Sequence, residues 1–194
     1  MAPTSLPDIS SRFTFRNWTQ GGYFYKEAAG ELGVPGQVMK HRDEDAQDDL
    51  RGDSGEHAGH LIGIQFGAPG GVENMGLQNP NMNTYAPRRL QEALRGHGAS
   101  FYELEMKWRK KLLQKPPSRI SVVVQDKYKV GENRPFARWV EWVETTPDNK
   151  KQPPQVERFG NFNSPQQMEA MGQSPGRATN NGKGGTLLRF RPRR

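Results

Sequence analysis

A histidine, a group of asparagines and a glutamate follow one another along the chain: His60, then Asn79, Asn81 and Asn83, then Glu105. Hydrolysis of a phosphodiester needs a base that deprotonates water, a cation that neutralises the phosphoryl oxygens, and a group that stabilises the leaving alkoxide. A neutral histidine is a good base near pH 7, and Mg²⁺ prefers oxygen ligands. These residues therefore predict metal-dependent phosphodiester cleavage, with His60 as general base and with amide and carboxylate oxygens around one Mg²⁺ ion.

Each of these residue types also has an ordinary structural role. A histidine beside a glycine, as in Gly59-His60, is more often structural than catalytic. Clustered asparagines often form loops, because they tolerate unusual backbone dihedrals. A glutamate on an amphipathic helix usually faces solvent, so residue types and spacing alone leave both interpretations open.

The pattern of apolar residues predicts the elements that would position these side chains. Residues 57–64 begin polar and turn apolar, which predicts a short strand that carries His60. Apolar residues recur every three or four positions in Phe101–Gln114, which predicts a helix. Arg119–Tyr128 and Phe136–Val143 alternate on either side of a turn, which predicts an antiparallel hairpin.

The other segments predict less regular structure. Residues 23–32 have weak helical character, and residues 43–56 hold seven acidic side chains, which is typical of a solvated acidic loop. Residues 164–186 have the Pro-, Gln-, Asn- and Gly-rich composition of a disordered segment. We therefore expect flexible termini and three parts: a lead-in segment (1–22), one domain (23–163), and a basic tail rich in Gly, Pro and Gln (164–194).

Composition narrows the kinds of site and partner. The 194 residues include no cysteine, so any metal must be held by oxygen or imidazole nitrogen. Residues 1–86 carry 6 basic and 11 acidic side chains and residues 87–194 carry 22 and 10, which gives net charges of −5 and +12. The basic half predicts a polyanionic partner, although a role in solubility explains it equally well. No apolar run is as long as a membrane span and no signal peptide is recognisable, so we expect no membrane partner.

Short motifs between residues 38 and 163 form a specific combination. In chain order they are His41-Arg42, GEHAGHLIG (55–63), FGAPGG (66–71), Leu77-Gln78-Asn79 with Asn83, YELEMKW (102–108) and GENRPF (131–136). Together they resemble the DNA/RNA non-specific endonuclease family, in the branch found at the C-termini of Rhs and other polymorphic bacterial toxins. The resemblance implies a loop-rich α+β fold, with a small antiparallel sheet and a ββα-metal (His-Me finger) core.

The resemblance also implies a role for each candidate residue. His60 matches the general base of the family. Asn83 matches its metal-binding asparagine, with Asn79 and Asn81 as alternates, and Glu105 matches its helical glutamate. One divalent metal ion, expected to be Mg²⁺, is therefore the implied cofactor.

Further residues near these motifs are candidates for the catalytic and binding machinery. His57 is a second candidate base or phosphate ligand, although a partly exposed loop histidine is the simpler interpretation. Arg51 and Arg42 are candidates for holding the scissile phosphate, unless they pair with the acidic loop. Basic side chains expected to bind nucleic-acid phosphates without reading sequence are Arg42, Arg88, Arg89, Lys107 and Lys111.

The resulting hypothesis is a sequence-tolerant, metal-dependent endonuclease that acts on DNA, with RNA as a further substrate. The toxin branch implies an antibacterial effector that a dedicated system exports without a signal peptide, that acts in the cytoplasm of the target cell, and that an immunity protein neutralises. One alternative is a metal-free ribonuclease that pairs His60 with His57 or His97, and another is a nucleic-acid-binding module without turnover. Glu105 and the asparagines favour the metal nuclease, because neither alternative needs them.

Overall fold

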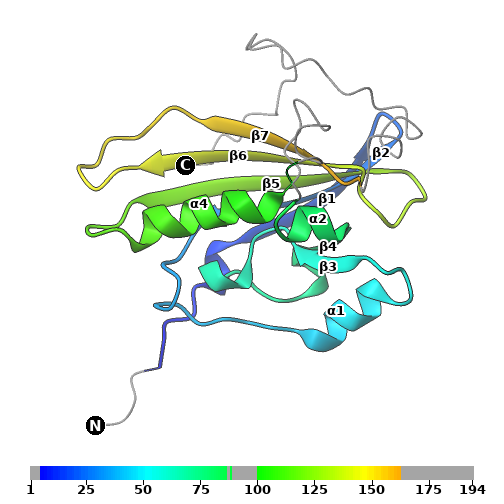
Figure 1. The fold of residues 1–194 in the computed structure, drawn as a ribbon, viewed down its shortest axis with the longest axis horizontal. Coiled ribbons are helices and arrows are strands. Elements are labelled where there is room, and N and C mark those ends of the chain that lie inside the picture. The colour runs from blue at the N-terminus through cyan, green and yellow to red at the C-terminus, as the bar shows by residue number, and fades with distance from the viewer. Residues whose placement is uncertain (1–4, 87, 89–99, 163–194) are drawn as a thin grey trace.

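A computed structural model describes residues 5–86, 88 and 100–162 of the chain. Its largest element is a five-stranded antiparallel sheet with the strand order β1-β2-β5-β6-β7 (Figure 1). These five strands form one continuous layer, because each strand is hydrogen-bonded to its neighbour along most of its length. The strands are β1 (Thr14–Gln20), β2 (Tyr23–Glu31), β5 (Arg119–Lys129), β6 (Ala137–Thr145) and β7 (Gln155–Gly160).

A second, smaller sheet carries the candidate base. β3 (His57–His60) and β4 (Met75–Gln78) pair antiparallel, and the short helix α2 (Pro80–Asn83) follows directly after Asn79. Helix α1 (Glu44–Arg51) packs against both strands. The fold is therefore α+β, and β3, β4 and α2 form a ββα unit, as the family resemblance implies. The single-turn 3₁₀ helices of the described residues are Ser10–Arg12, Ile64–Phe66 and Val72–Asn74.

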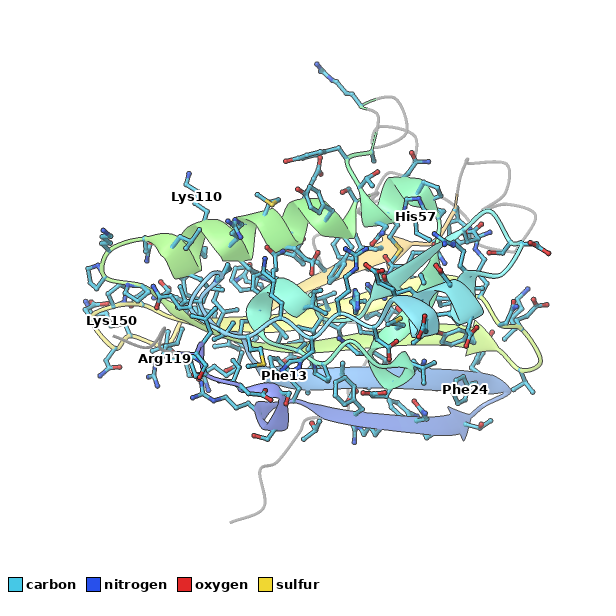
Figure 2. All side chains as sticks on the ribbon, turned by 90° about the horizontal axis from the view of Figure 1, so that it is seen from below. Phe13, Phe24, His57, Lys110, Arg119 and Lys150 are labelled. Atoms are coloured by element: carbon cyan, nitrogen blue, oxygen red, sulfur yellow. The ribbon has the colours of Figure 1, made fainter. Side chains whose placement is uncertain are left out.

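The hydrophobic core lies between one face of the large sheet and the helix α4 (Phe101–Leu113). Trp108 is fully buried at its centre, with its ring centroid 5.9 Å from that of Phe101 and 6.3 Å from that of Trp142. Helices α1 and α4 and the β3–β4 pair all lie on this side of the sheet (Figures 1 and 2). The β3–β4 pair that carries the candidate base is therefore packed on one face of the five-stranded sheet.

Two expected elements are confirmed. Helix α4 begins after Ser100, whose Oγ accepts a hydrogen bond from the Glu103 N–H and so caps the helix. Strands β5 and β6 form the predicted antiparallel hairpin. The strand predicted to carry His60 also forms, although it ends at His60 itself.

Three segments near the N-terminus differ from expectation. In the segment 23–32, residues 23–31 form the strand β2 and not a helix, because nine-residue pairing with β5 outweighs a weak local preference. The segment 1–22 is more than a lead-in, since it contains the edge strand β1. The acidic segment 43–56 contains the helix α1, whose N-terminus Asp43 caps by accepting a hydrogen bond from the Ala46 N–H.

The predicted disordered segment 164–186 and the tail 164–194 lie outside the described residues. The division of the chain into a domain and a tail therefore stays a prediction. In the part of the chain that is described, no helix is both long and apolar enough to cross a membrane.

Candidate active site

His60 is the last residue of β3, and its side chain is partly buried. Its Nε2 atom is buried and has no hydrogen-bond partner among residues 5–86, 88 and 100–162. Burial lowers the pKa of His60 to about 4, and the positive charges of Arg138 and Arg42 act in the same direction. The imidazole is therefore neutral at pH 7 and can accept a proton, which a general base must do.

His57, at the start of β3, contacts the candidate metal ligand Asn83. The Nδ2 atom of Asn83 lies 3.2 Å from Nδ1 of His57. Because an amide nitrogen only donates, Nδ1 must be the acceptor, and within the described residues Oδ1 of Asn83 accepts no hydrogen bond. That carbonyl oxygen is the atom that would bind Mg²⁺, so the contact with His57 orients Asn83 for this role.

Asn79 has a structural role in the fold, so its expected role as an alternate metal ligand has less support and stays a prediction. Its fully buried side chain caps α2, with Oδ1 accepting from the Met82 N–H at 3.0 Å and Nδ2 donating to Oδ1 of Asn161 at 3.1 Å. Asn161 also accepts from the backbone N–H of Asn79 and donates to two backbone carbonyls. Since these contacts use both ends of the Asn79 amide, Asn83 is the better candidate ligand.

Glu105 reaches from α4 to the segment that follows His60. Its Oε1 accepts a hydrogen bond from the Gly63 N–H at 3.0 Å, and a Cβ atom at Gly63 would lie only 2.5 Å from this oxygen. Although part of the side chain is accessible, burial raises the pKa of Glu105 to about 7, against the opposing effects of Arg138 and the Gly63 N–H. The negative charge of this buried carboxylate is only partly stabilised by its neighbours, so a bound cation would stabilise it further.

Replacing Glu105 by glutamine is expected to stabilise the metal-free protein in alkaline solution. Because folding raises the pKa of Glu105 from 4.5 to about 7, the folded state binds more protons in this window and stability falls as pH rises through it. Glutamine removes this dependence, so Glu105→Gln should raise the free energy of unfolding by up to about 3 kcal/mol at alkaline pH and change it little in acid. Urea unfolding in EDTA at acidic and alkaline pH measures the difference.

The matched control for this variant is Glu132→Gln, at an exposed position in the turn between β5 and β6. This control should change stability little at either pH, because its carboxylate stays in water in both states. A Glu105→Gln effect that is the same at both pH values would contradict the raised pKa.

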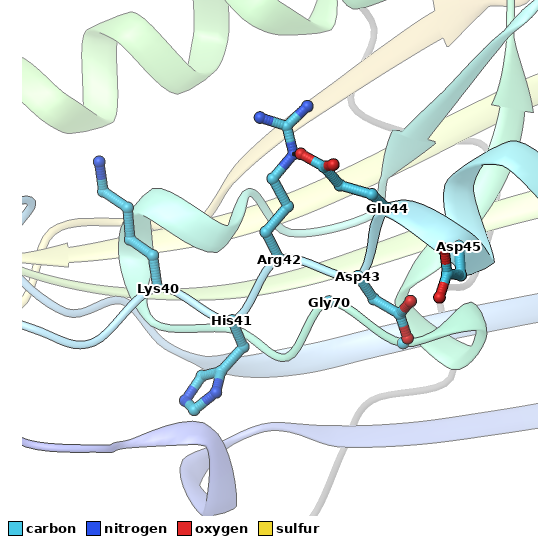
Figure 3. A pocket seen from close by; sticks show the side chains of 8 residues that line it. Lys40, His41, Arg42, Asp43, Glu44, Asp45 and Gly70 are labelled. Carbon is cyan, nitrogen blue, oxygen red and sulfur yellow. Dashed lines mark ion pairs between the residues drawn. The ribbon is translucent and has the colours of Figure 1, made fainter.

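An open groove of about 750 Å³ lies beside the ββα unit and is lined by residues 40–45 with Gly70 and Gly71 (Figure 3). Within it, Nε of Arg42 lies 3.2 Å from Oε1 of Glu44, and both side chains are mostly exposed. The positive charge of Arg42 is also one of the causes, after burial and Arg138, that lower the pKa of His60. An exposed ion pair contributes little free energy, so an incoming phosphate can compete with Glu44 for Arg42.

The two candidate lysines of α4 are already paired with carboxylates. Nζ of Lys111 donates to Glu144 at 2.6 Å, and Nζ of Lys107 lies 3.7 Å from Glu157. Two residues along a helix correspond to a rotation of about 200°, so Lys107 lies on the side of α4 away from Glu105. We therefore expect both lysines to contribute less to substrate binding than Arg42.

The remaining arginine candidates have different environments. Nη2 of Arg51 lies 2.5 Å from Oδ1 of Asp48 on the same helix, so Arg51 pairs with the acidic segment, and its catalytic role stays a prediction. Arg88 is exposed, as a phosphate-binding residue should be, and Arg89 lies outside the described residues.

A buried ion pair behind His60 was missed by the sequence analysis. Arg138 and Asp126 are fully buried, and the guanidinium Nε and Nη2 donate to the carboxylate at 2.7 and 2.8 Å. Nη1 of Arg138 also donates to the backbone oxygen of His60 at 3.0 Å. The sequence did contain a signal, because Arg138 is in phase with the buried Val140 and Trp142, and a charge on the core face of a strand requires a buried partner.

The structure brings some of the candidates together and not others. His57 contacts Asn83, and Glu105 contacts the residue three positions after His60, but in the described ranges no hydrogen bond joins the His60 ring to Asn83 or Glu105. Among the described residues, no group of three or more His, Asp or Glu side chains is arranged to hold a metal ion. An amide oxygen and a carboxylate still fit Mg²⁺ chemically, since this ion keeps several waters and commonly takes one or two protein ligands.

No family model matches the chain. The fold is similar to three solved structures. One described as an extracellular nuclease has a TM-score of 0.47 at 11% identity, over 84% of this chain and 91% of its own. One described as an extracellular endonuclease has a TM-score of 0.45 at 13% identity, over 82% of this chain and 83% of its own. A complex of EndoG with EndoGI, described as showing the mechanism of EndoG inhibition, has a TM-score of 0.43 at 14% identity, over 76% of this chain and 75% of its own. At these identities the likeness concerns the fold alone.

Proposed function

We propose that the protein is a Mg²⁺-dependent endonuclease that cleaves phosphodiester bonds of DNA, with RNA as a further substrate. The observation that carries this proposal is the environment of His60. Burial keeps its ring neutral, and within the described residues its buried Nε2 atom has no hydrogen-bond partner, so no contact of the protein occupies this nitrogen. The sequence motifs around the ββα unit support the same assignment.

In the proposed reaction, Nε2 of His60 accepts a proton from the attacking water, whose oxygen bonds to phosphorus while the bond to the leaving oxygen breaks. Oδ1 of Asn83 and the carboxylate of Glu105 would hold Mg²⁺, directly or through water, and His57 keeps the amide of Asn83 in orientation. When bound, Mg²⁺ supplies neutralising charge for the phosphoryl and leaving oxygens. Arg42 would bind a phosphate oxygen beside this site.

The paired-histidine ribonuclease has less support. His57 and His60 lie at the two ends of β3, three positions apart, and within the described residues no hydrogen bond joins their rings. One of them is also engaged with Asn83. His97, the other suggested partner of His60, lies outside the described residues.

Incubation of the purified chain with supercoiled plasmid DNA tests the proposal. We expect nicked and then linear DNA with Mg²⁺, no products with EDTA, and recovery of cleavage when Mg²⁺ is added back. Single-stranded RNA is assayed in parallel. Cleavage of RNA alone that persists in EDTA would favour the paired-histidine ribonuclease, and salt-sensitive DNA retention without products would favour a binding module.

We further propose that this activity serves an antibacterial toxin, a role supported by the sequence resemblance. The protein would be exported by a dedicated system and act in the cytoplasm of the target cell. An immunity protein that covers the basic half should present an acidic surface. Expression of the wild-type chain in a bacterial cytoplasm should stop growth, whereas expression of the His60→Ala variant should not.

A further inference from the structure

The β3–β4 pair and the 3₁₀ turn before β4 are attached to the large sheet by two cations that donate to their backbone oxygens. Nζ of Lys26, on β2, donates to the oxygens of Met75 at 2.7 Å and Val72 at 2.8 Å. Nη1 of Arg138, on β6, donates to the oxygen of His60 at 3.0 Å. His60 and Met75 are partners in the β3–β4 ladder, so the two cations hold both members of the residue pair that carries the candidate base.

A buried carboxylate supports these two cations. Asp126 makes the two-bond ion pair with Arg138, and it also favours the charged form of Lys26. A Cβ atom at position 76 would lie 2.7 Å from Oδ2 of Asp126 and 2.9 Å from Oη of Tyr128, so Gly76 lets β4 approach this network closely. Directional polar contacts, and not apolar packing alone, therefore set the position of the β3–β4 pair on the sheet.

We propose that Lys26 and Arg138 are positioning residues for the nuclease reaction, because they fix the backbone of His60 and so the place of its imidazole. This inference rests on the proposed function. Neither side chain lines the groove that contains Arg42, so both should affect turnover more than substrate binding. A displacement of a catalytic group by about 1 Å can lower a rate by about 100-fold, which makes such positioning consequential.

The first test compares Lys26→Met with Lys127→Met. Lys127 lies on the neighbouring strand but on the opposite face of the sheet, where its Nζ lies 3.8 Å from the centroid of the Tyr23 ring. Both variants lose one partly buried ammonium group, but only the first loses contacts to β4. We expect Lys26→Met to lower kcat by about 10- to 100-fold with a nearly unchanged KM, and Lys127→Met to change neither strongly.

Amide hydrogen exchange provides a readout that does not depend on activity. Lys26→Met should speed exchange of the β3–β4 amides, including the Leu61 N–H that bonds to the Asn74 oxygen, relative to the amides of the β5–β6 hairpin. If the chain proves not to be a nuclease, this comparison still tests the attachment of β3–β4. Unchanged exchange and unchanged kcat in an active enzyme would overturn the inference while leaving the proposed function intact.

Arg138 needs a paired variant, because its removal alone would leave the Asp126 charge buried without a partner. The double variant Asp126→Leu/Arg138→Met removes both charges and keeps the branched shape of the first side chain and the unbranched stem of the second. We expect a lower kcat together with an upward shift of the His60 pKa in an NMR titration, since Arg138 and Arg42 are the two charged groups that lower it. A double variant with wild-type kcat and an unshifted His60 pKa would contradict a positioning role for Arg138.

Discussion

Replacing His60 by alanine is expected to lower kcat for plasmid cleavage by about 10²- to 10⁴-fold, the usual contribution of a general base. The reason is that the methyl group cannot take the proton of the attacking water. KM should change little, because His60 is partly buried and does not line the groove that contains Arg42. Initial rates at saturating DNA and Mg²⁺ measure the effect, and circular dichroism checks that the variant is folded.

Two other histidines serve as controls for this variant. His41→Ala should keep near wild-type activity, because His41 bonds to Asp8 at 2.9 Å and points away from Arg42 in Figure 3. His57→Ala should lower activity less than His60→Ala does, and more Mg²⁺ should partly restore it, since His57 acts by orienting Asn83. If His57→Ala abolished cleavage and His60→Ala did not, the base would have to be reassigned to His57.

Replacing Asn83 by alanine is expected to remove the amide oxygen that holds the metal ion. Changes around metal sites commonly cost about 10- to 100-fold in affinity or activity, and loss of a direct ligand should cost at least this much. The defect should appear mainly as a higher Mg²⁺ concentration needed for half-maximal cleavage, with partial recovery at high Mg²⁺. Titration of cleavage rate against Mg²⁺, supported by calorimetric titration of the metal without DNA, measures it.

Asn81→Ala is the matched control for this second variant. Asn81 lies on the same short helix, is partly exposed like Asn83, and is an alternate ligand in the sequence analysis. We expect its Mg²⁺ dependence to match the wild type. If the wild type, Asn83→Ala and Asn81→Ala had the same Mg²⁺ dependence, neither asparagine would be a metal ligand. A defect in Asn81→Ala alone would assign the ligand to Asn81 in place of Asn83.

Local patterns in the sequence determined the parts of the fold that depend on short-range periodicity. The apolar residues of α4 recur at helical spacing, and β5 and β6 alternate on either side of a turn, so both elements could be predicted. The candidate residues His60, Asn83 and Glu105 were identified by residue type and motif, because the chemistry of a nuclease restricts both. Their roles in the reaction stay predictions until the variants are measured.

Tertiary contacts decided the rest. Residues 23–31 form a strand because β1 and β5 bond to both of its edges, which no local propensity encodes. Asn79 and Asn83 look equivalent in the sequence, but Asn161, 82 residues away, engages the first and leaves the second available. The attachment of His60 to Arg138 also spans 78 residues, and contacts between such distant positions exist only once the strands have paired.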